Sequence, residues 1–201
     1  PARKEELSLP HKSSTKAGVS QLSAAERGTV HHEFLQVVDF SETMTALDLR
    51  NEAARLEAVG VFSPEQVAAL DFAALEKFCQ SDYAAEMRSM PLECIHREMP
   101  FTARFAAEEL RQLAGGVAED FAADEFVVVQ GTVDLVVLQA REIWLLDFKT
   151  DDVGEADLLD KAKHYELQLK LYALALERIY NRPVTDCRLW FLTAGRSVKI
   201  K

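Results

Sequence analysis

The first part of the chain carries patterns that predict helices. Val30, Phe34 and Val38 recur every four residues, which is the spacing of one face of a helix. The segment 43–90 is rich in Ala and Leu and contains the helix-start sequences "SET" and "SPEQ". We expect three or four helices there, packed as a helical cap. Residues 1–20 have little periodicity and many Lys, Glu, Ser and Pro residues, which predicts a flexible linker or arm.

A different pattern follows, in which β-branched and apolar runs predict strands. The expected elements are strands over 94–105, 126–138, 142–150 and 187–193 and a long helix over 155–180. The second and third runs are apolar on both faces, which is typical of central strands covered by helices on each side. The order strand, hairpin, long helix, strand predicts an α/β fold, with a mixed sheet flanked by helices and a helical N-terminal region. We place the α/β core at 94–201, within one domain over 21–201.

The two central runs form a hairpin whose register can be predicted. A turn at Ala140–Arg141 places Asp134 opposite Asp147, with side chains roughly 5 Å apart. Lys149 follows on the same face as Asp147, because side chains in a strand repeat every two residues. Ala-Arg is not a favoured two-residue turn, so a register shifted by one residue or more is the alternative.

Two opposed carboxylates repel each other unless a cation lies between them. Left alone, one of them would have a raised pKa. Oxygen ligands of this kind suit Mg²⁺ or Mn²⁺, which can activate a water and stabilise charge on a phosphate. The compact ammonium of Lys149 could orient that water or neutralise the transition state. The alternative is that Asp147 and Lys149 form only a structural ion pair at the edge of the sheet.

Composition narrows the partners and cofactors. The 201 residues carry a net charge of −10, which argues against a broad electrostatic grip on nucleic acid. The three cysteines are far apart, so we expect free thiols in a reducing compartment, and they are too few for a four-cysteine iron–sulfur cluster. We expect no membrane span and no signal peptide. The first residue is Pro and "SVKIK" at the end reads as the start of a strand, which suggests a piece of a longer protein.

Four short stretches occur in an order that points to a family. They are "RGTVHHEFLQ" (27–36), "QGTVDLVV" (130–137), "LLDFKTD" (145–151) and "QLKLY" (168–172). Together they resemble the motifs of the RecB-like branch of the PD-(D/E)XK nucleases, and within it the C-terminal nuclease domain of AddA-type helicase–nucleases. The sequence "REMPFT" (97–102) resembles the strand that precedes the core of this family. The resemblance covers about residues 20–200 and implies a restriction-endonuclease-like fold.

The resemblance implies roles for individual residues. His32, Asp134 and Asp147 would bind the metal, with the backbone carbonyl of Phe148 as a further ligand. Asp134 and Asp147 would thereby be catalytic together with Lys149, which would be the catalytic lysine. The metal would be Mg²⁺, with Mn²⁺ possible, and the cysteine count departs from the subset of the family that carries an iron–sulfur cluster.

Further positions are implied less directly. Gln168 and Tyr172, four residues apart on one helix face, would support the site and contact DNA, or else simply pack. His32 rather than His31 falls at the family position, and a slip of one residue would rotate the ring by about 100° around the helix. Glu98 would lie behind the metal ligands.

The resemblance also implies a function and its setting. The chain would be a metal-dependent DNA exonuclease domain, part of a helicase–nuclease that processes double-strand breaks in recombinational repair. A helicase motor in the same full-length chain would deliver single strands, and the partner would be a second helicase–nuclease subunit. The location would be cytoplasmic and nucleoid-associated, in a bacterium. The alternatives are a catalytically inactive docking or DNA-binding module and a free-standing nuclease without a motor. The motor's P-loop motif is absent from these residues.

Overall fold

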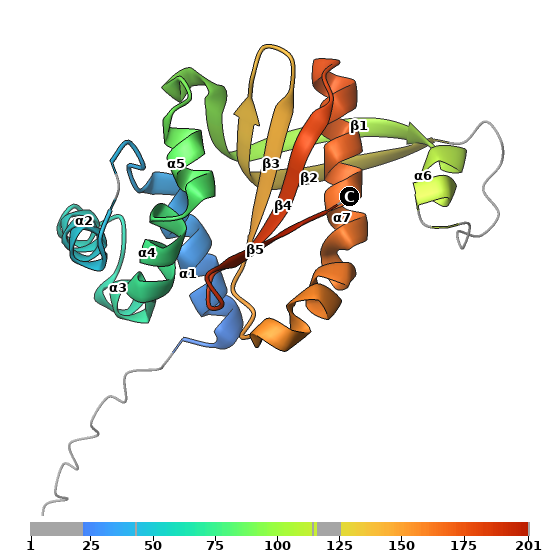
Figure 1. The fold of residues 1–201 in the computed structure, drawn as a ribbon. Helices are drawn as coiled ribbons and strands as arrows, with labels where there is room; N and C mark the ends of the chain where they lie inside the picture. Colours follow the sequence, from blue (N-terminus) through green and yellow to red (C-terminus); the bar gives the residue numbers. More distant parts are fainter. Residues whose placement is uncertain (1–21, 43, 114, 116–125, 201) are drawn as a thin grey trace, which may run out of the picture.

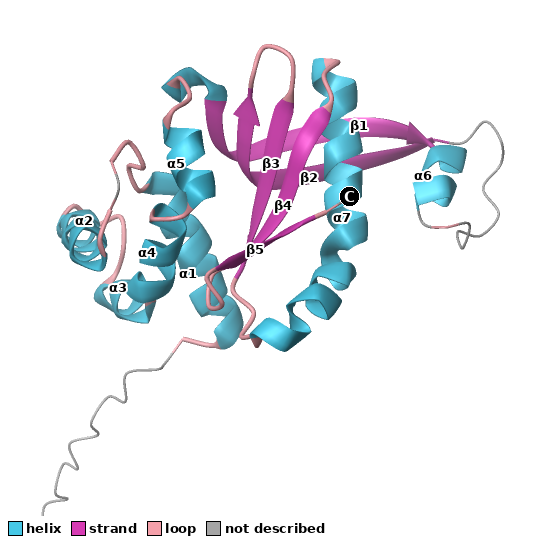
Figure 2. Cartoon of the chain, in the orientation of Figure 1, coloured by secondary structure: helices cyan, strands magenta, loops and turns pink. Residues whose placement is uncertain are grey.

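The fold is a five-stranded sheet with helices on both faces (Figures 1 and 2). The computed structural model describes residues 22–42, 44–113, 115 and 126–200. The arm expected at 1–20 lies outside the described residues. The helices are α1 (Ala24–Val37), α2 (Ala46–Ala58), α3 (Pro64–Ala69), α4 (Phe72–Cys79), α5 (Asp82–Arg88), α6 (Ala107–Leu113) and α7 (Leu158–Tyr180), with short 3₁₀ turns at Leu92–Cys94 and Glu155–Asp157. The strands are β1 (Ile95–Ala106), β2 (Phe126–Leu138), β3 (Ile143–Lys149), β4 (Val184–Phe191) and β5 (Arg196–Lys199).

The sheet is mixed, as the sequence predicts. Its strand order is β1-β2-β3-β4-β5, and every neighbouring pair is antiparallel except β3 and β4. Parallel strands need a long crossover, and α7 provides it between β3 and β4. The fold class predicted from the sequence is therefore confirmed.

Local sequence fixes where the first helices start. α3 begins as "SPEQ" predicts, with Ser63 as the N-cap, Pro64 in the first turn and Gln66 completing a capping box. α2 begins later than "SET" suggests, at Thr45, because Asp48 lies three residues beyond Thr45 and bonds back to it. Four helices lie between residues 46 and 88, where the sequence predicts three or four.

Two hydrophobic clusters hold the helices against the sheet. On one face, Phe34 of α1 and Phe78 of α4 pack with Phe148 and Trp190 of the central strands. On the other face, α7 covers a second cluster that includes Leu145 and Leu189 of the sheet. β3 is buried on both faces because it lies between these clusters, as expected for a central strand.

The predicted burial of β2 is correct for only half of the strand. The segment from Val133 to Val137 is almost entirely buried, whereas the first half of β2 alternates between exposed and half-buried residues. Phe126 is 51% exposed and Val128 is 53% exposed. The reason is that β1 and β2 run on together as a long ribbon past the other strands, so one face of the ribbon meets solvent (Figure 1).

The hairpin register is confirmed and shows where the sheet divides. Val136 pairs with Leu145 and Leu138 with Ile143, as the turn predicts. The ladder between β2 and β3 ends at the pair Leu135–Leu146, while β1 and β2 stay paired along the ribbon. We call this point of divergence the fork. It includes the residues just beyond the last pair, which are Asp134 on β2 and Asp147 and Phe148 on β3. At the fork the Phe148 N–H bonds to the Asp134 side chain rather than to the β2 backbone.

Two further features concern the helices and the cysteines. α6 is a helix of seven residues that the sequence pattern did not indicate.

None of the helices in the described part of the chain is long and apolar enough to cross a membrane. The three cysteines are free, and burial raises the pKa of Cys79 to about 11 and of Cys187 to about 12.

Candidate active site

The two neighbouring histidines of α1 point to different parts of the molecule. His32 Nδ1 lies 3.3 Å from Asp134 Oδ1 at the fork. His31 is buried, its Nδ1 lies 2.7 Å from the carbonyl oxygen of Arg27, and its Nε2 lies 2.9 Å from the backbone nitrogen of Asp71. Because the Asp71 N–H donates to Nε2, the proton of neutral His31 must be on Nδ1. His31 therefore links α1 to the start of α4, and only His32 faces the sheet.

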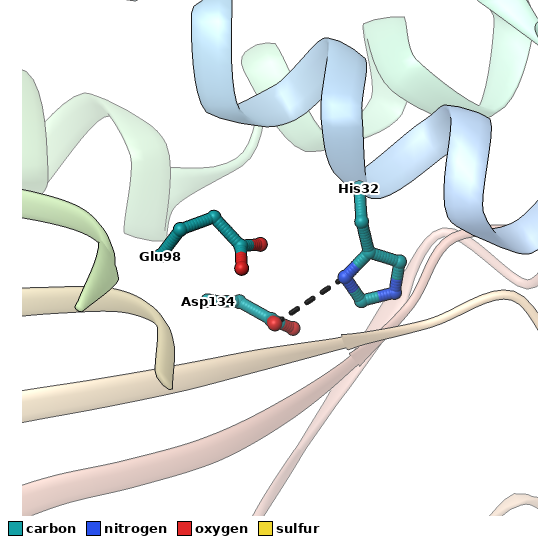
Figure 3. A group of neighbouring side chains, drawn as sticks. All are labelled: His32, Glu98 and Asp134. Carbon is teal, nitrogen blue, oxygen red and sulfur yellow. Dashed lines mark ion pairs between the residues drawn. The ribbon is translucent and has the colours of Figure 1, made fainter. Parts of the chain in front are cut away.

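Glu98 brings a third side chain to this place through an unusual backbone conformation. Its φ angle is 47°, in the left-handed region, and the pairing of β1 with β2 skips it, although its register position is opposite Asp134. The potential ligand atoms of His32, Glu98 and Asp134 all lie within 4.8 Å of one another (Figure 3). Non-glycine residues rarely adopt this conformation, and such strain concentrates at functional sites.

Charge accumulates within this group. Burial raises the pKa of Glu98, and the neighbouring Asp134 carboxylate raises it further. Burial lowers the pKa of His32, but the hydrogen bond to Asp134 and the charges of Asp134, Asp147 and Glu98 outweigh it, so the pKa is raised. The carboxylate of Asp134 contributes to both shifts, in addition to the burial that raises the pKa of Glu98.

Asp147 is the most perturbed carboxyl group at the fork. It is 3% exposed, and its Oδ2 atom lies 2.6 Å from Lys149 Nζ. Burial and the charge of Asp134 raise its pKa to about 6, and the Lys149 ammonium offsets only part of this rise. The Asp147 carboxylate is thus subject to the charges of both Asp134, which raises its pKa, and Lys149, which lowers it.

The backbone of Phe148 faces the site. Its N–H donates to Asp134 Oδ2 over 2.6 Å, in place of a bond to the β2 backbone. In a strand the N–H and C=O of one residue point to the same edge. The Phe148 carbonyl is therefore directed toward β2 as well, beyond the end of the ladder.

Gln168 and Tyr172 lie together on α7. Gln168 Nε2 donates to the Tyr172 hydroxyl over 3.0 Å, and the Tyr172 ring packs edge-on against Phe101 of β1. A Cβ on Gly131 would lie 2.8 Å from the Phe101 ring and 3.1 Å from the Tyr172 ring. The glycine of the "QGTVD" stretch thus allows β2 to pass beneath two aromatic rings. Among the described residues, the Gln168 side chain has no hydrogen bond to Asp134, Asp147 or Lys149.

The structure adds a group of residues that sequence reasoning did not assign. Tyr165 of α7 lies beside Lys149, whose Nζ is 4.2 Å from the centre of the ring. The Tyr165 hydroxyl donates to Asp151 over 2.8 Å, and Asp151 also pairs with Lys161. In the sequence, Asp151 is only the last acid of "LLDFKTD" and Tyr165 only an aromatic residue three positions before Gln168. Neither position by itself indicates a contact with Lys149.

A groove of about 710 Å³ opens beside the fork. Its walls include His32 of α1, the segment from Phe148 to Asp152 and Tyr165 of α7. α1 can approach the end of β3 because residue 28 is glycine, and a Cβ there would lie 2.8 Å from Thr150 Oγ1. The groove gives a ligand of the size of a nucleotide access to Lys149.

The donor set at the fork fits a hard divalent cation. Asp134 and Glu98 offer carboxylate oxygens and His32 offers a nitrogen. Asp147 is not part of this close group, and its Oδ2 atom lies 2.6 Å from Lys149 Nζ. Oxygen-rich sets with one imidazole suit Mg²⁺ and Mn²⁺. Burial and the charge of Asp134 raise the pKa values of Asp147 and Glu98, and a bound cation would offset both effects.

Known proteins resemble this chain over most of its length. Proteins named as one subunit of an "ATP-dependent helicase/nuclease" are 35% identical over 182 residues in Moorella thermoacetica, 32% over 183 in Carboxydothermus hydrogenoformans and 33% over 187 in Bacillus cereus. These alignments cover 89%, 91% and 90% of this chain, but only 12%, 15% and 14% of the relatives. The crystal structure of SSO0001 covers 88% of this chain and 72% of that chain at 13% identity, with a TM-score of 0.36. The family description "PD-(D/E)XK nuclease superfamily" matches residues 4–199. The chain therefore belongs to the PD-(D/E)XK nuclease superfamily and is homologous to a part of these helicase–nuclease proteins.

Proposed function

We propose that this domain hydrolyses phosphodiester bonds of DNA and that it requires Mg²⁺, which Mn²⁺ can replace. The observation that carries the proposal is the environment of Asp147, a buried carboxyl whose pKa is raised to about 6 although Lys149 lies 2.6 Å away. Such a surplus of negative charge beside a lysine that lines a groove is expected of a site that binds a metal and a phosphate.

Four groups would hold the metal. These are the side chains of His32, Asp134 and Asp147 and the backbone carbonyl of Phe148. Glu98 is close enough to His32 and Asp134 to bind the metal directly or to accept a hydrogen bond from a water on it. When bound, the cation supplies a water of lowered pKa and stabilises charge on the phosphate.

The remaining steps belong to the chain itself. Lys149 can donate a hydrogen bond to a phosphate oxygen, where negative charge grows in the transition state. Its side chain is 15% exposed, so the charge acts in a site from which most bulk water is excluded. The groove beside the fork would hold the strand that carries the scissile phosphate.

The relatives suggest the setting. Their printed name describes an "ATP-dependent helicase/nuclease", and this chain spans about a seventh of their length. We propose that the domain acts as an exonuclease on single strands that a helicase motor in the same full-length chain delivers, with a second helicase–nuclease subunit, in the repair of double-strand breaks in a bacterial cytoplasm. The net charge of −10 is consistent with delivery by a partner, because the domain itself offers little attraction for DNA.

The competing function is a docking or DNA-binding module without catalysis. Such a module has no need of an intact reactive set, whereas this chain has His32, Asp134, Asp147 and Lys149 at one place. The intact set favours the enzyme.

The test is cleavage of end-labelled oligonucleotides and of a closed circular single strand by the purified protein. We expect Mg²⁺-dependent shortening of the linear strand, no cutting of the circle, and no activity with a chelator. Lys149→Ala should be inactive, whereas Lys163→Ala, which removes an exposed lysine paired with Asp160 on α7, should behave as the unaltered protein. Cutting of the circle would make the domain an endonuclease. DNA binding without cleavage at any metal concentration would favour the docking module.

A further inference from the structure

The ammonium of Lys149 lies between two partners. One is Asp147 of the same strand, at 2.6 Å, and the other is the ring of Tyr165 on α7, whose centre is 4.2 Å from Nζ. A cation over the face of an aromatic ring is attracted by the negative charge density of that face. Because Lys149 is only 15% exposed, this attraction is less screened than at the surface.

Tyr165 is itself fixed by two charged residues. Its hydroxyl donates to Asp151 Oδ2 over 2.8 Å, and Asp151 Oδ1 lies 2.8 Å from Lys161 Nζ. A phenol that donates to a carboxylate has a more electron-rich ring, which strengthens its attraction for the Lys149 ammonium. Lys161 neutralises Asp151, so this carboxylate competes less for Lys149, which lies only two residues earlier in the chain.

We propose that Tyr165 is a positioning residue for Lys149 and that Asp151 and Lys161 hold its ring in place. The proposal rests on the proposed nuclease function. Lysine is a flexible point charge, and the carboxylate that holds it here, Asp147, is also a proposed metal ligand. When Asp147 is engaged by a cation, the ring of Tyr165 is the partner that keeps the ammonium beside the fork.

Position, rather than activity, gives the first test. Protons above an aromatic face are shifted upfield in NMR spectra, so the ε-methylene protons of Lys149 should be shifted in the metal-free protein. Tyr165→Phe should retain this shift and Tyr165→Leu should lose it. Leu167→Ala, which truncates a 49% exposed residue on the same helix, is the matched control and should leave the shift unchanged. An unshifted Lys149 signal in the unaltered protein would overturn the proposal.

Kinetics give the second test, on a single-stranded oligonucleotide with Mg²⁺. Tyr165→Leu should lower kcat by about three- to thirtyfold, with KM and the Mg²⁺ concentration for half-maximal rate unchanged, because only the transition-state contact of Lys149 is loosened. Tyr165→Phe, which keeps the ring, should recover most of the rate, and Asp151→Asn should fall between the two. Thermal unfolding of each variant separates a misplaced lysine from a damaged fold.

Two results would overturn the positioning role while the nuclease function stands. The first is a raised KM with unchanged kcat in Tyr165→Leu, which would make Tyr165 a contact for DNA. The second is wild-type kinetics in Tyr165→Leu. An unaltered protein that fails to cleave DNA with any divalent metal would instead overturn the proposed function, and the NMR comparison would still decide the position of Lys149.

Discussion

Replacing Asp147 by asparagine should stabilise the metal-free protein at neutral and alkaline pH. Asp147 is 3% exposed, and its pKa in the folded protein is raised from 3.8 to about 6 by burial and by Asp134. The folded state therefore holds a proton more tightly than the unfolded state. Below the unfolded pKa the carboxyl is neutral in both states and costs nothing. The penalty grows as the pH rises from the unfolded to the folded pKa, and it is complete above the folded pKa.

The size of the effect follows from the shift. About two pKa units at roughly 1.4 kcal/mol each give a ceiling of about 3 kcal/mol above about pH 6. Asparagine has nearly the same shape and no charge, so Asp147→Asn should raise the free energy of unfolding by up to this amount at about pH 8, and by almost nothing below about pH 4. Added Mg²⁺ should reverse the order, because only the unaltered protein gains from metal binding.

Urea denaturation at several pH values, with a chelator and then with Mg²⁺, measures both effects. Asp186→Asn is the matched control on the neighbouring strand β4. Asp186 pairs with Arg188 at 2.8 Å and with Lys199 at 3.0 Å, so its replacement should lower stability. A fall of several kcal/mol in the free energy of unfolding for Asp147→Asn, without metal at about pH 8, would refute the reasoning. It would mean that the ion pair with Lys149 stabilises the fold by more than the burial of the carboxylate costs.

Three further predictions concern single positions. Lys149→Ala and Lys149→Arg should both fail to cleave DNA, and arginine fails because a planar guanidinium does not replace a compact ammonium. Both variants should still bind Mg²⁺ in calorimetry, and lost metal binding would contradict the role assigned to Lys149. His32→Ala should weaken Mn²⁺ binding and slow cleavage by orders of magnitude. His31→Ala should keep its metal affinity but unfold more easily, by about 1 kcal/mol in denaturation, because it removes the hydrogen bond that the Asp71 N–H donates to the His31 ring. Gly28→Ala should lower the melting temperature, since its Cβ would lie 2.8 Å from Thr150 Oγ1, and Thr150→Ala should restore it; a neutral Gly28→Ala would mean that α1 shifts freely.

The sequence predicts the central part of the fold because its patterns there are unambiguous. The β-branched runs at β2 and β3 are long, and their burial on both faces leaves one register, which the pairs Val136–Leu145 and Leu138–Ile143 confirm. The burial predicted for the ribbon beyond the fork was wrong. The side chains of Phe126 and Val128 look like core residues in sequence, but nothing local tells how far the helices extend over the sheet.

The parts of the site that the sequence did not predict depend on tertiary contacts. The positive φ of Glu98 breaks the pattern of a strand, and no spacing in "REMPFT" indicates it. Tyr165 lies on α7 and Asp151 just after β3, at positions where many polar residues could stand. Their role becomes visible only when the structure places Tyr165 beside Lys149 and in contact with Asp151. His31 resembled a bystander in sequence because its partner is the start of α4, 40 residues away.

The position of His32 on α1 has a consequence for the order in which the protein is made. α1 lies near the start of the chain, whereas Asp134 and Asp147 lie on strands that are synthesised later. At ordinary translation speeds the histidine leaves the ribosome roughly ten seconds before β3 does. Until β3 has been made, α1 can pack only against the other helices of its hydrophobic cluster and not against the complete sheet. A chain interrupted before β3 therefore carries His32, Glu98 and Asp134 but lacks Asp147 and Lys149, so the proposed site cannot be complete until β3 has been made.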